Sequence, residues 1–261
     1  IKTMKLEKIK DDKKNKKLSF LLKGSNEVFA NTIRRLIIEE VPTLAVEEVE
    51  VKDNSSALHD EMLALRLGLV PIKTDLKSYR LPKNQDEITE KSASCTLQLK
   101  LKANKKGYVY AGEAESDDPK CTFVYEKMPV VKLLSKQKVD VIMTAVMGQG
   151  KEHTKWTPGL THYKKEPVVK VGKVQNPERL ASVCSDGVFK IKGNTVEVVP
   201  EKVYESKLLD TYAEMDKGIS VTYSDNLVFN VESWGQLTCK EMLTKSAEIL
   251  LEKIEEMEKL L

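Results

Sequence analysis

The chain has 261 residues, of which 41% are hydrophobic and 32% are charged. This length and apolar content suit one large folded domain or two smaller ones, and they exclude a disordered protein. The 43 basic and 40 acidic residues leave a net charge of only +3. Proteins that bind mainly the DNA backbone carry a strong basic excess, so this near balance argues against nucleic acid as the main partner.

The sequence carries no sign of membrane insertion or secretion. No apolar stretch approaches the roughly 20 residues that a membrane span requires. Residues 1–17 are rich in lysine but have no apolar core of a secretory signal. The four cysteines are far apart and form no C-x-x-C pair, so we expect reduced thiols: Cys95, Cys121, Cys184 and Cys239. We therefore expect a cytoplasmic protein without membrane contact.

The first expected element is a β-hairpin, with strands at 4–7 and 18–22 around a polar turn at 11–15. The lysines of this turn could form a nucleic-acid patch. A solvated turn explains them better, because no aromatic residue interleaves them.

A helix is expected over 25–40, with Ser25 or Asn26 as its cap and Pro42 after its end. Helical spacing places five apolar residues on one face: Phe29, Ala30, Ile33, Leu36 and Ile37. The other side holds Asn31, Arg34 and Arg35, with Ile38 between the two arginine positions. This second side is either a contact surface, since interfaces combine apolar area with arginine, or an ordinary face with one exposed isoleucine.

The middle of the chain is expected to be rich in strands. The pattern predicts a strand at 43–51, then a helix over 57–72 that Pro71 stops, and then a loop from 73 to 91. Two further strands are expected at 95–101 and 139–146, with turns at 111–120 between them. Another strand is expected at 167–174. The pattern then predicts a helix at 178–183, strands at 187–193 and 194–199, a charged helix over 202–215, and a hairpin over 219–233 that turns at 224–226.

The last segment, 238–261, is the clearest predicted helix. Thr238 and Glu241 have the spacing of a capping box, with Leu237 and Met242 as its hydrophobic staple. One apolar seam has the alternating four- and three-residue steps of a helix that packs on another long helix: Leu243, Ala247, Leu250, Ile254, Met257 and Leu261. This spacing fits either a partner subunit or the chain's own sheet.

No convincing catalytic pattern is present. The three histidines are scattered and form no zinc-protease motif. Residues 148–151, Gly-Gln-Gly-Lys, hint at a phosphate loop, but the upstream glycine is missing and Glu152 follows the lysine. No sequence pattern brings two acidic residues together for general acid–base catalysis. The sequence therefore indicates a binding or scaffold role.

Three segments resemble one family. The first is VFANTIRRLIIEEVPTLAVEEVEVKDNSSALHDEMLALRLGLVPIKTD, at 28–75; the others are GQGKEHTKWTP, at 148–158, and the C-terminal VFNVESWGQLTCKEMLTKSAEILLEKIEEMEKL. They resemble the D subunits of archaeal RNA polymerase, which are relatives of the bacterial alpha N-terminal domain and of the eukaryotic third-largest subunit. The likeness covers nearly the whole chain and is weakest from 172 to 218.

The resemblance implies an α+β fold with an alpha-subunit-like dimerisation domain built from both chain ends, at 1–42, 163–175 and 218–261. A mixed β-rich domain is expected as an insert at 43–162. A small, degenerate ferredoxin-like insert is expected at 176–217.

The resemblance also implies a role: a non-catalytic assembly subunit of DNA-directed RNA polymerase. Helices 26–40 and 238–261 would pair with subunit L, and this heterodimer, with subunits N and P, would be the platform for the two large catalytic subunits. Direct contact with DNA is not expected. The implied dimerisation residues are Phe29, Ile33, Leu36, Leu243, Ala247, Leu250, Ile254 and Met257. The implied large-subunit interface is Asn31, Arg34, Arg35, Ile38, Asp60, Glu61 and Arg66, although Asp60 or Arg66 could equally pair within the chain.

The chain departs from the family in its cysteines. Some members bind an iron–sulfur cluster in the third domain, but here only Cys184 resembles a ligand, and a cluster needs several thiolates. A zinc loop near 80–95 would likewise need clustered cysteines, and only Cys95 is there. We therefore expect neither cofactor.

Overall fold

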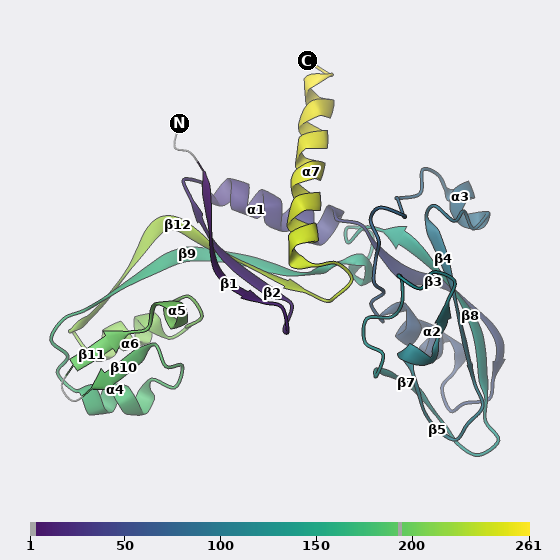
Figure 1. Cartoon of the computed structure of the whole chain (residues 1–261), viewed down its shortest axis with the longest axis horizontal. Helices are drawn as coiled ribbons and strands as arrows, with labels where there is room; N and C mark the ends of the chain where they lie inside the picture. Colours follow the sequence, from purple (N-terminus) through teal and green to yellow (C-terminus); the bar gives the residue numbers. More distant parts are fainter. Residues whose placement is uncertain (1–3, 193–194) are drawn as a thin grey trace. The chain divides into compact units, whose positions relative to one another are not determined.

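The computed structural model describes residues 4–192 and 195–261. It shows a mixed α+β fold with several antiparallel sheets, which confirms the α+β class of the expected fold (Figure 1). The chain divides into two compact units. The first holds the chain up to Asp12, Leu18–Asn31 and His162–Asn230, and the second holds Lys13–Lys17, Thr32–Thr161 and Val231–Leu261. Within the described residues, no helix is long and apolar enough to span a membrane.

A four-stranded sheet has the strand order β1-β2-β12-β9. Its strands are β1 (Lys5–Asp12), β2 (Lys17–Lys23), β9 (Gly159–Val171) and β12 (Ile219–Ser233), so the N-terminal hairpin is confirmed and β9 begins earlier than predicted. The hairpin predicted across 224–226 is wrong, because β12 is one continuous strand. Its two polar side chains point to a neighbouring strand instead of making a turn: Ser224 Oγ and Asn226 Nδ2 each donate to the Glu166 carboxylate on β9 at 2.8 Å.

The segment between β9 and β12 has its own small core. It consists of α4 (Pro177–Val183), the antiparallel pair β10 (Phe189–Lys192) and β11 (Thr195–Val198), α5 (Pro200–Val203) and α6 (Leu209–Met215). The two strands were predicted, although positions 193 and 194 lie outside the described residues. The single helix predicted over 202–215 is wrong. The chain leaves α5 at Tyr204, and the Ser206 hydroxyl accepts a hydrogen bond from the Leu208 amide in the intervening turn.

The second unit is built on the antiparallel sheet β3-β8-β4-β6. These strands are β3 (Thr43–Asn54), β8 (Val139–Gly148), β4 (Thr96–Ala103) and β6 (Glu115–Ser116). A separate pair, β5 (Gly107–Tyr110) and β7 (Pro129–Leu133), was not predicted. The unit also contains α2 (Asp60–Gly68), shorter than predicted, the short α3 (Gln85–Thr89) inside the predicted loop, and the 3-10 turns η2 (Ala111–Glu113) and η3 (Thr154–Trp156).

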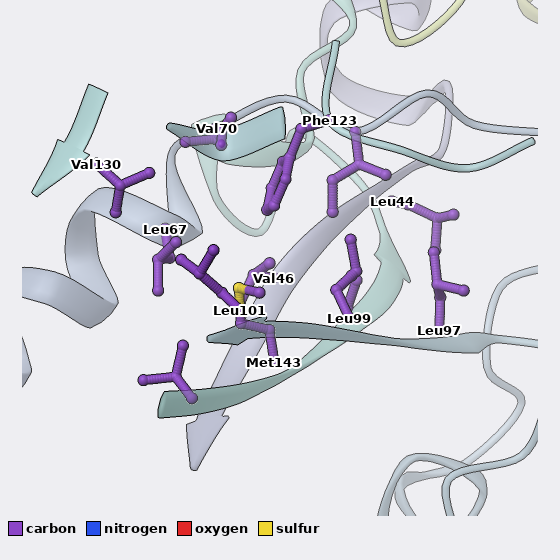
Figure 2. Packing of buried hydrophobic residues seen from close by; sticks show 14 of the residues in the cluster. Leu44, Val46, Leu67, Val70, Leu97, Leu99, Leu101, Phe123, Val130 and Met143 are labelled. Carbon is purple, nitrogen blue, oxygen red and sulfur yellow. The ribbon is translucent and has the colours of Figure 1, made fainter. Parts of the chain in front are cut away.

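Alternation along the strands creates the core of this unit. Leu97, Leu99 and Leu101 on β4 are buried and lie among Leu44 and Val46 of β3 and Met143 of β8, as Figure 2 shows. Leu63 and Leu67 close the core from α2. Each fully buried aliphatic side chain contributes about 1.5–3 kcal/mol of hydrophobic stabilisation, so this sheet and α2 form a stable base for the surfaces around them.

The two predicted interface helices are present. The first is α1 (Glu27–Arg35), continued by one π-helical turn, η1 (Leu36–Glu40), and Asn26 Oδ1 caps it by accepting from the Phe29 amide at 2.9 Å. The last is α7 (Cys239–Glu258), the yellow helix of Figure 1. The capping box is confirmed: the Thr238 amide donates to Glu241 at 2.8 Å, and the Glu241 amide donates to the Thr238 hydroxyl at 3.2 Å.

Candidate subunit interface

The π turn η1 is held by side chains and backbone from a distant segment. A π turn widens the helix and leaves carbonyl groups without their usual partners, and such turns are frequent at functional sites. Here these carbonyls accept hydrogen bonds from Thr157 Oγ1 (to Ile38, 3.3 Å), Lys151 N (to Glu39, 3.0 Å) and Gln149 Nε2 (to Glu40, 2.8 Å). The segment 149–157 therefore fixes the shape of this turn.

The glycines of this segment have a steric role. A Cβ on Gly150 would lie 2.0 Å from the Ile38 carbonyl oxygen, and a Cβ on Gly148 would lie 2.4 Å from the Trp156 ring. Real Cβ atoms do not approach other atoms so closely, so only glycine fits at both positions. The Gly-Gln-Gly-Lys pattern thus lets the chain pack directly on η1, and this packing explains the motif without a phosphate.

Glu40, at the end of η1, ties this turn to α7. Its carboxylate accepts from Lys253 Nζ at 2.8 Å and from Lys151 Nζ at 3.3 Å. The hydrogen bond from Lys253 is the main reason that the pKa of Glu40 lies below its ordinary value of 4.5. On the same side of α7, Met242, Ser246 and Ile249 are buried against the chain.

Replacing Glu40 with glutamine is expected to lower the free energy of unfolding by about 1 kcal/mol at pH 7, because two charged hydrogen bonds are lost at a partly screened site. A carboxylate whose pKa is lowered in the folded state stabilises it above the unfolded pKa of 4.5, and this contribution disappears as the pH falls through the folded pKa. Urea unfolding of both proteins between pH 3 and pH 8 tests this. A difference that stays constant over that range would contradict it.

A neighbouring side of α7 is uncovered. Residues 251–261 are all exposed, and they include Leu251, Ile254 (46% exposed), Met257 (63%) and Leu261. Ala247 is exposed and Leu243 and Leu250 are half-buried on the same side. The predicted seam therefore lies on an outer face, which is defined here as Leu243, Ala247, Leu250, Leu251, Ile254, Met257 and Leu261. A contiguous apolar surface of this kind marks a protein interaction site.

The chain as a whole is similar to proteins of one known family. The model of the RNA polymerase Rpb3/Rpb11 dimerisation domain matches residues 19–254. The chain belongs to this family. It is 36% identical over 240 residues to DNA-directed RNA polymerase subunit Rpo3 of Pyrococcus horikoshii, an alignment covering 90% of each protein. It is 33% identical to the Rpo3 of Pyrococcus furiosus (95% of this chain, 96% of that one) and 32% identical to that of Methanosarcina acetivorans (91% of each).

The expected dimerisation residues of this Rpb3/Rpb11-type domain fall into two groups. On the first helix, Ile33 and Leu36 are buried within the chain and Phe29 is half-buried. On α7, the outer face is exposed from Leu251 to the end of the helix. Leu251 extends this face and was missed, because it lies off the four- and three-residue seam.

The residues expected to face a large subunit lie on two elements. On α1 and η1, Asn31, Arg34 and Ile38 are half-buried, while Arg35 is exposed and its guanidinium forms an ion pair with Glu39 at 3.1 Å. This ion pair raises the pKa of Arg35.

On α2, the expected residues are at the surface and form local hydrogen bonds. Asp60 accepts from Asn54 Nδ2 at 2.7 Å, Arg66 donates to the Pro129 carbonyl at 2.7 Å, and Glu61 is exposed. Sequence reasoning missed three exposed apolar residues, Met62 and Leu65 on the same helix and Leu69 at its C-cap. Their spacing of three and four residues was the signal that could have found them.

The cysteines lie apart from one another. Cys95 and Cys121 are buried, and burial raises the pKa of both thiols, that of Cys121 to about 11. Cys184 donates to the Asp186 carboxylate at 3.3 Å. Within residues 4–192 and 195–261, no three His, Cys, Asp or Glu side chains come together as a metal site.

Proposed function

We propose that this protein is a non-catalytic assembly subunit of a DNA-directed RNA polymerase. The observation that supports it most is the outer face of α7, which exposes contiguous apolar residues in a chain whose family model is a dimerisation domain. The relatives are named as polymerase subunits, which supports the assignment of that face to assembly. In this role the protein carries no catalytic group of its own.

The proposed first partner is subunit L, a smaller subunit that would cover α7 and the exposed part of α1. Hydrophobic association is favoured because the outer face places leucine, isoleucine and methionine in water in the free chain. The heterodimer, with subunits N and P, would then bind the two large subunits through the exposed parts of α1, η1 and α2. We also propose the three-part division that the resemblance implies: a dimerisation domain at 1–42, 163–175 and 218–261, and inserts at 43–162 and 176–217.

We also propose that the protein holds neither an iron–sulfur cluster nor zinc. Cys184 is the single cysteine of the 176–217 insert, and one thiolate cannot hold a cluster. Purified protein is expected to be colourless and to contain less than about 0.1 mole of iron or zinc per mole. Elemental analysis after anaerobic purification checks this, and either metal at a one-to-one ratio or higher would disprove it.

The proposed function is tested by purifying the chain from native extract. The tag belongs at the N-terminus, because a C-terminal tag would lie on the outer face of α7. Mass spectrometry of the eluate at moderate salt should find one smaller subunit with the same dimerisation domain, together with the two large polymerase subunits. Elution of the chain alone, or with nucleic acid only, would disprove the assembly role.

A further inference from the structure

Two exposed tyrosines and four exposed lysines lie on one ribbon of the second unit and on the turns that adjoin it. The tyrosines are on β5, one lysine is on β7, and the turns hold the other three lysines. We call this set the Tyr108 surface: Lys105, Lys106, Tyr108, Tyr110, Lys132 and Lys136. None of these residues belongs to α1, η1, α2 or α7, so the surface is separate from the elements assigned above to contacts with other subunits.

Strand pairing brings the lysine-bearing turns together. The turn 104–106 leads from β4 to β5, and the turn 134–138 leads from β7 to β8. Since β4 pairs with β8 and β5 pairs with β7, the two turns run between the same two ladders and lie side by side. Lys105, Lys106 and Lys136 are thereby concentrated at one end of the ribbon, and all three are exposed.

The two tyrosine rings form an aromatic platform that is open to water. Their centroids lie 6.3 Å apart, and the residues Tyr108 and Tyr110 are 55% and 39% exposed. Tyr108 pairs with Lys132 across the ribbon, and Lys132 Nζ lies 5.2 Å from the centre of the Tyr108 ring. On the other face of the ribbon, Val109 and Val131 are buried in the core. The core therefore fixes the strands that carry the rings and the ammonium group.

The positive charge of the Tyr108 surface is not neutralised locally. Neither strand and neither turn contains an acidic residue, and the four lysines form no ion pair with any residue that the structure describes. Two neighbouring lysines differ in this respect, because each is paired with an aspartate: Lys102 with Asp140, and Lys138 with Asp53. The nearest carboxylate along the chain, that of Glu113, accepts from the Tyr110 amide at 2.8 Å. A net charge of only +3 for the chain thus conceals a local basic patch.

Lysines beside exposed aromatic rings match the chemistry of a single-stranded nucleic acid. Its phosphates pair with ammonium groups, and its unpaired bases stack on aromatic side chains. A duplex offers only its phosphates, because its bases are already stacked on each other. The lysine turn of the N-terminal hairpin lacks this combination, since no aromatic residue interleaves its lysines.

We propose that the Tyr108 surface binds single-stranded RNA, with bases on the two tyrosine rings and phosphates on the four lysines. The source of the strand rests on the proposed function, because a DNA-directed RNA polymerase releases a single strand of RNA as its product. The binding is independent of base sequence, since the surface offers stacking and charge. It adds a second function to a subunit whose proposed role is assembly.

The first test measures RNA binding by the purified full chain. Fluorescence anisotropy with a labelled, unstructured RNA of about 12 nucleotides should give a Kd of roughly 1–100 μM at 0.15 M salt, the range of sequence-independent binding. Tyr108→Ala should weaken binding at least about fivefold, because stacking on one ring is lost. Tyr108→Phe keeps the ring and should bind like the wild type. No binding in this concentration range, or equal binding by the alanine and phenylalanine variants, would overturn the inference.

Two double variants separate the Tyr108 surface from the lysine turn of the N-terminal hairpin. Lys105→Gln with Lys106→Gln removes two phosphate contacts, so the slope of log Kd against log salt should fall by about 1.4. Lys13→Gln with Lys14→Gln removes the same charge from another exposed turn and should leave the slope unchanged. Equal effects of the two double variants would show diffuse attraction and would overturn the assignment.

The source of the strand is tested in the assembled polymerase. A transcript that carries 4-thiouridine should crosslink to this subunit under ultraviolet light, and Tyr108→Ala should reduce the crosslink at least about fivefold. Crosslinks from the DNA alone, tighter binding of duplex DNA than of single-stranded RNA, or binding of an acidic peptide without RNA would each overturn the inference. A native purification that recovers no polymerase subunit disproves the proposed function, whereas normal assembly without RNA binding disproves this inference alone.

Discussion

Replacing Ile254 with aspartate is expected to weaken binding of the smaller dimer partner at least about 100-fold. Ile254 lies in the middle of the outer face of α7, with Leu250 and Met257 one turn away on either side. An unpaired carboxylate buried in an apolar interface loses its hydration without gaining a partner. A central interface residue of this kind is commonly worth 2 kcal/mol or more, and about 2.7 kcal/mol corresponds to the 100-fold change.

The same substitution should leave the free chain folded, because Ile254 is about half exposed and touches none of the second unit's core cluster. Its thermal unfolding midpoint is expected to change by less than about 2 °C. Lys259→Asp is the matched control, since it places the same side chain near the same end of α7 on the other side of the helix. Titration calorimetry with the purified partner measures the affinities. Equal affinity of Ile254→Asp and wild type would show that the outer face is not the dimer surface.

The two faces of α7 show which structural features a local sequence pattern predicts and which it does not. The capping box was predicted correctly because it depends only on four consecutive residues. The predicted seam lies on the outer face, although it omitted Leu251, and its spacing could not say whether this face meets the chain or a partner. The face that does pack on the chain includes Ser246, a polar residue that a hydrophobic pattern cannot reveal. Contacts between residues far apart in sequence, such as Lys253 with Glu40, determine which face of α7 is buried.

The two wrong predictions in the first unit, a hairpin at 224–226 and a helix over 202–215, also arise from contacts between residues far apart in sequence. Ser224-Asp225-Asn226 has strong turn propensity, but two of these side chains bind Glu166 across the sheet and the strand continues. The helix predicted over 202–215 breaks where the Ser206 hydroxyl also bonds Asp186, twenty residues earlier. In each case a long-range hydrogen bond overrides local propensity, which is weak by comparison.

The candidate site likewise has features that the sequence predicted and features that it did not. The first helix and its apolar arc were predictable, since Ala30, Ile33, Leu36 and Ile37 are all buried. The π turn was not, because it depends on donors from 149–157. The Tyr108 surface also could not be predicted, since its residues come from two stretches of the chain that only the pairing of β5 with β7 brings together. A surface on a single helix or strand can be predicted from residue spacing, whereas a surface assembled from several segments cannot.

Replacing Gly150 with alanine is expected to be the most destabilising single-methyl change in this part of the molecule. The new Cβ would lie 2.0 Å from the Ile38 carbonyl oxygen, which is backbone and cannot rotate away. The segment 149–151 would have to move off η1, and the hydrogen bonds to the Glu39 and Glu40 carbonyls would lengthen. We expect a loss of about 3 kcal/mol in the free energy of unfolding, at the upper end of the usual cost of overpacking. For a chain of this size that corresponds to a fall of about 6–10 °C in the unfolding midpoint.

Gly68→Ala is the matched control and should have the opposite sign. A Cβ at Gly68 would meet only the Val46 carbonyl oxygen at 3.5 Å, an ordinary contact. This position lies in the last turn of α2, where alanine is favoured over glycine by up to about 1 kcal/mol. Thermal unfolding of the two variants compares the same added methyl group at two glycines. If Gly150→Ala were as stable as the wild type, the close packing on η1 would not be required. The glycines of 148–151 would then need another explanation, and a ligand for that loop would have to be considered again.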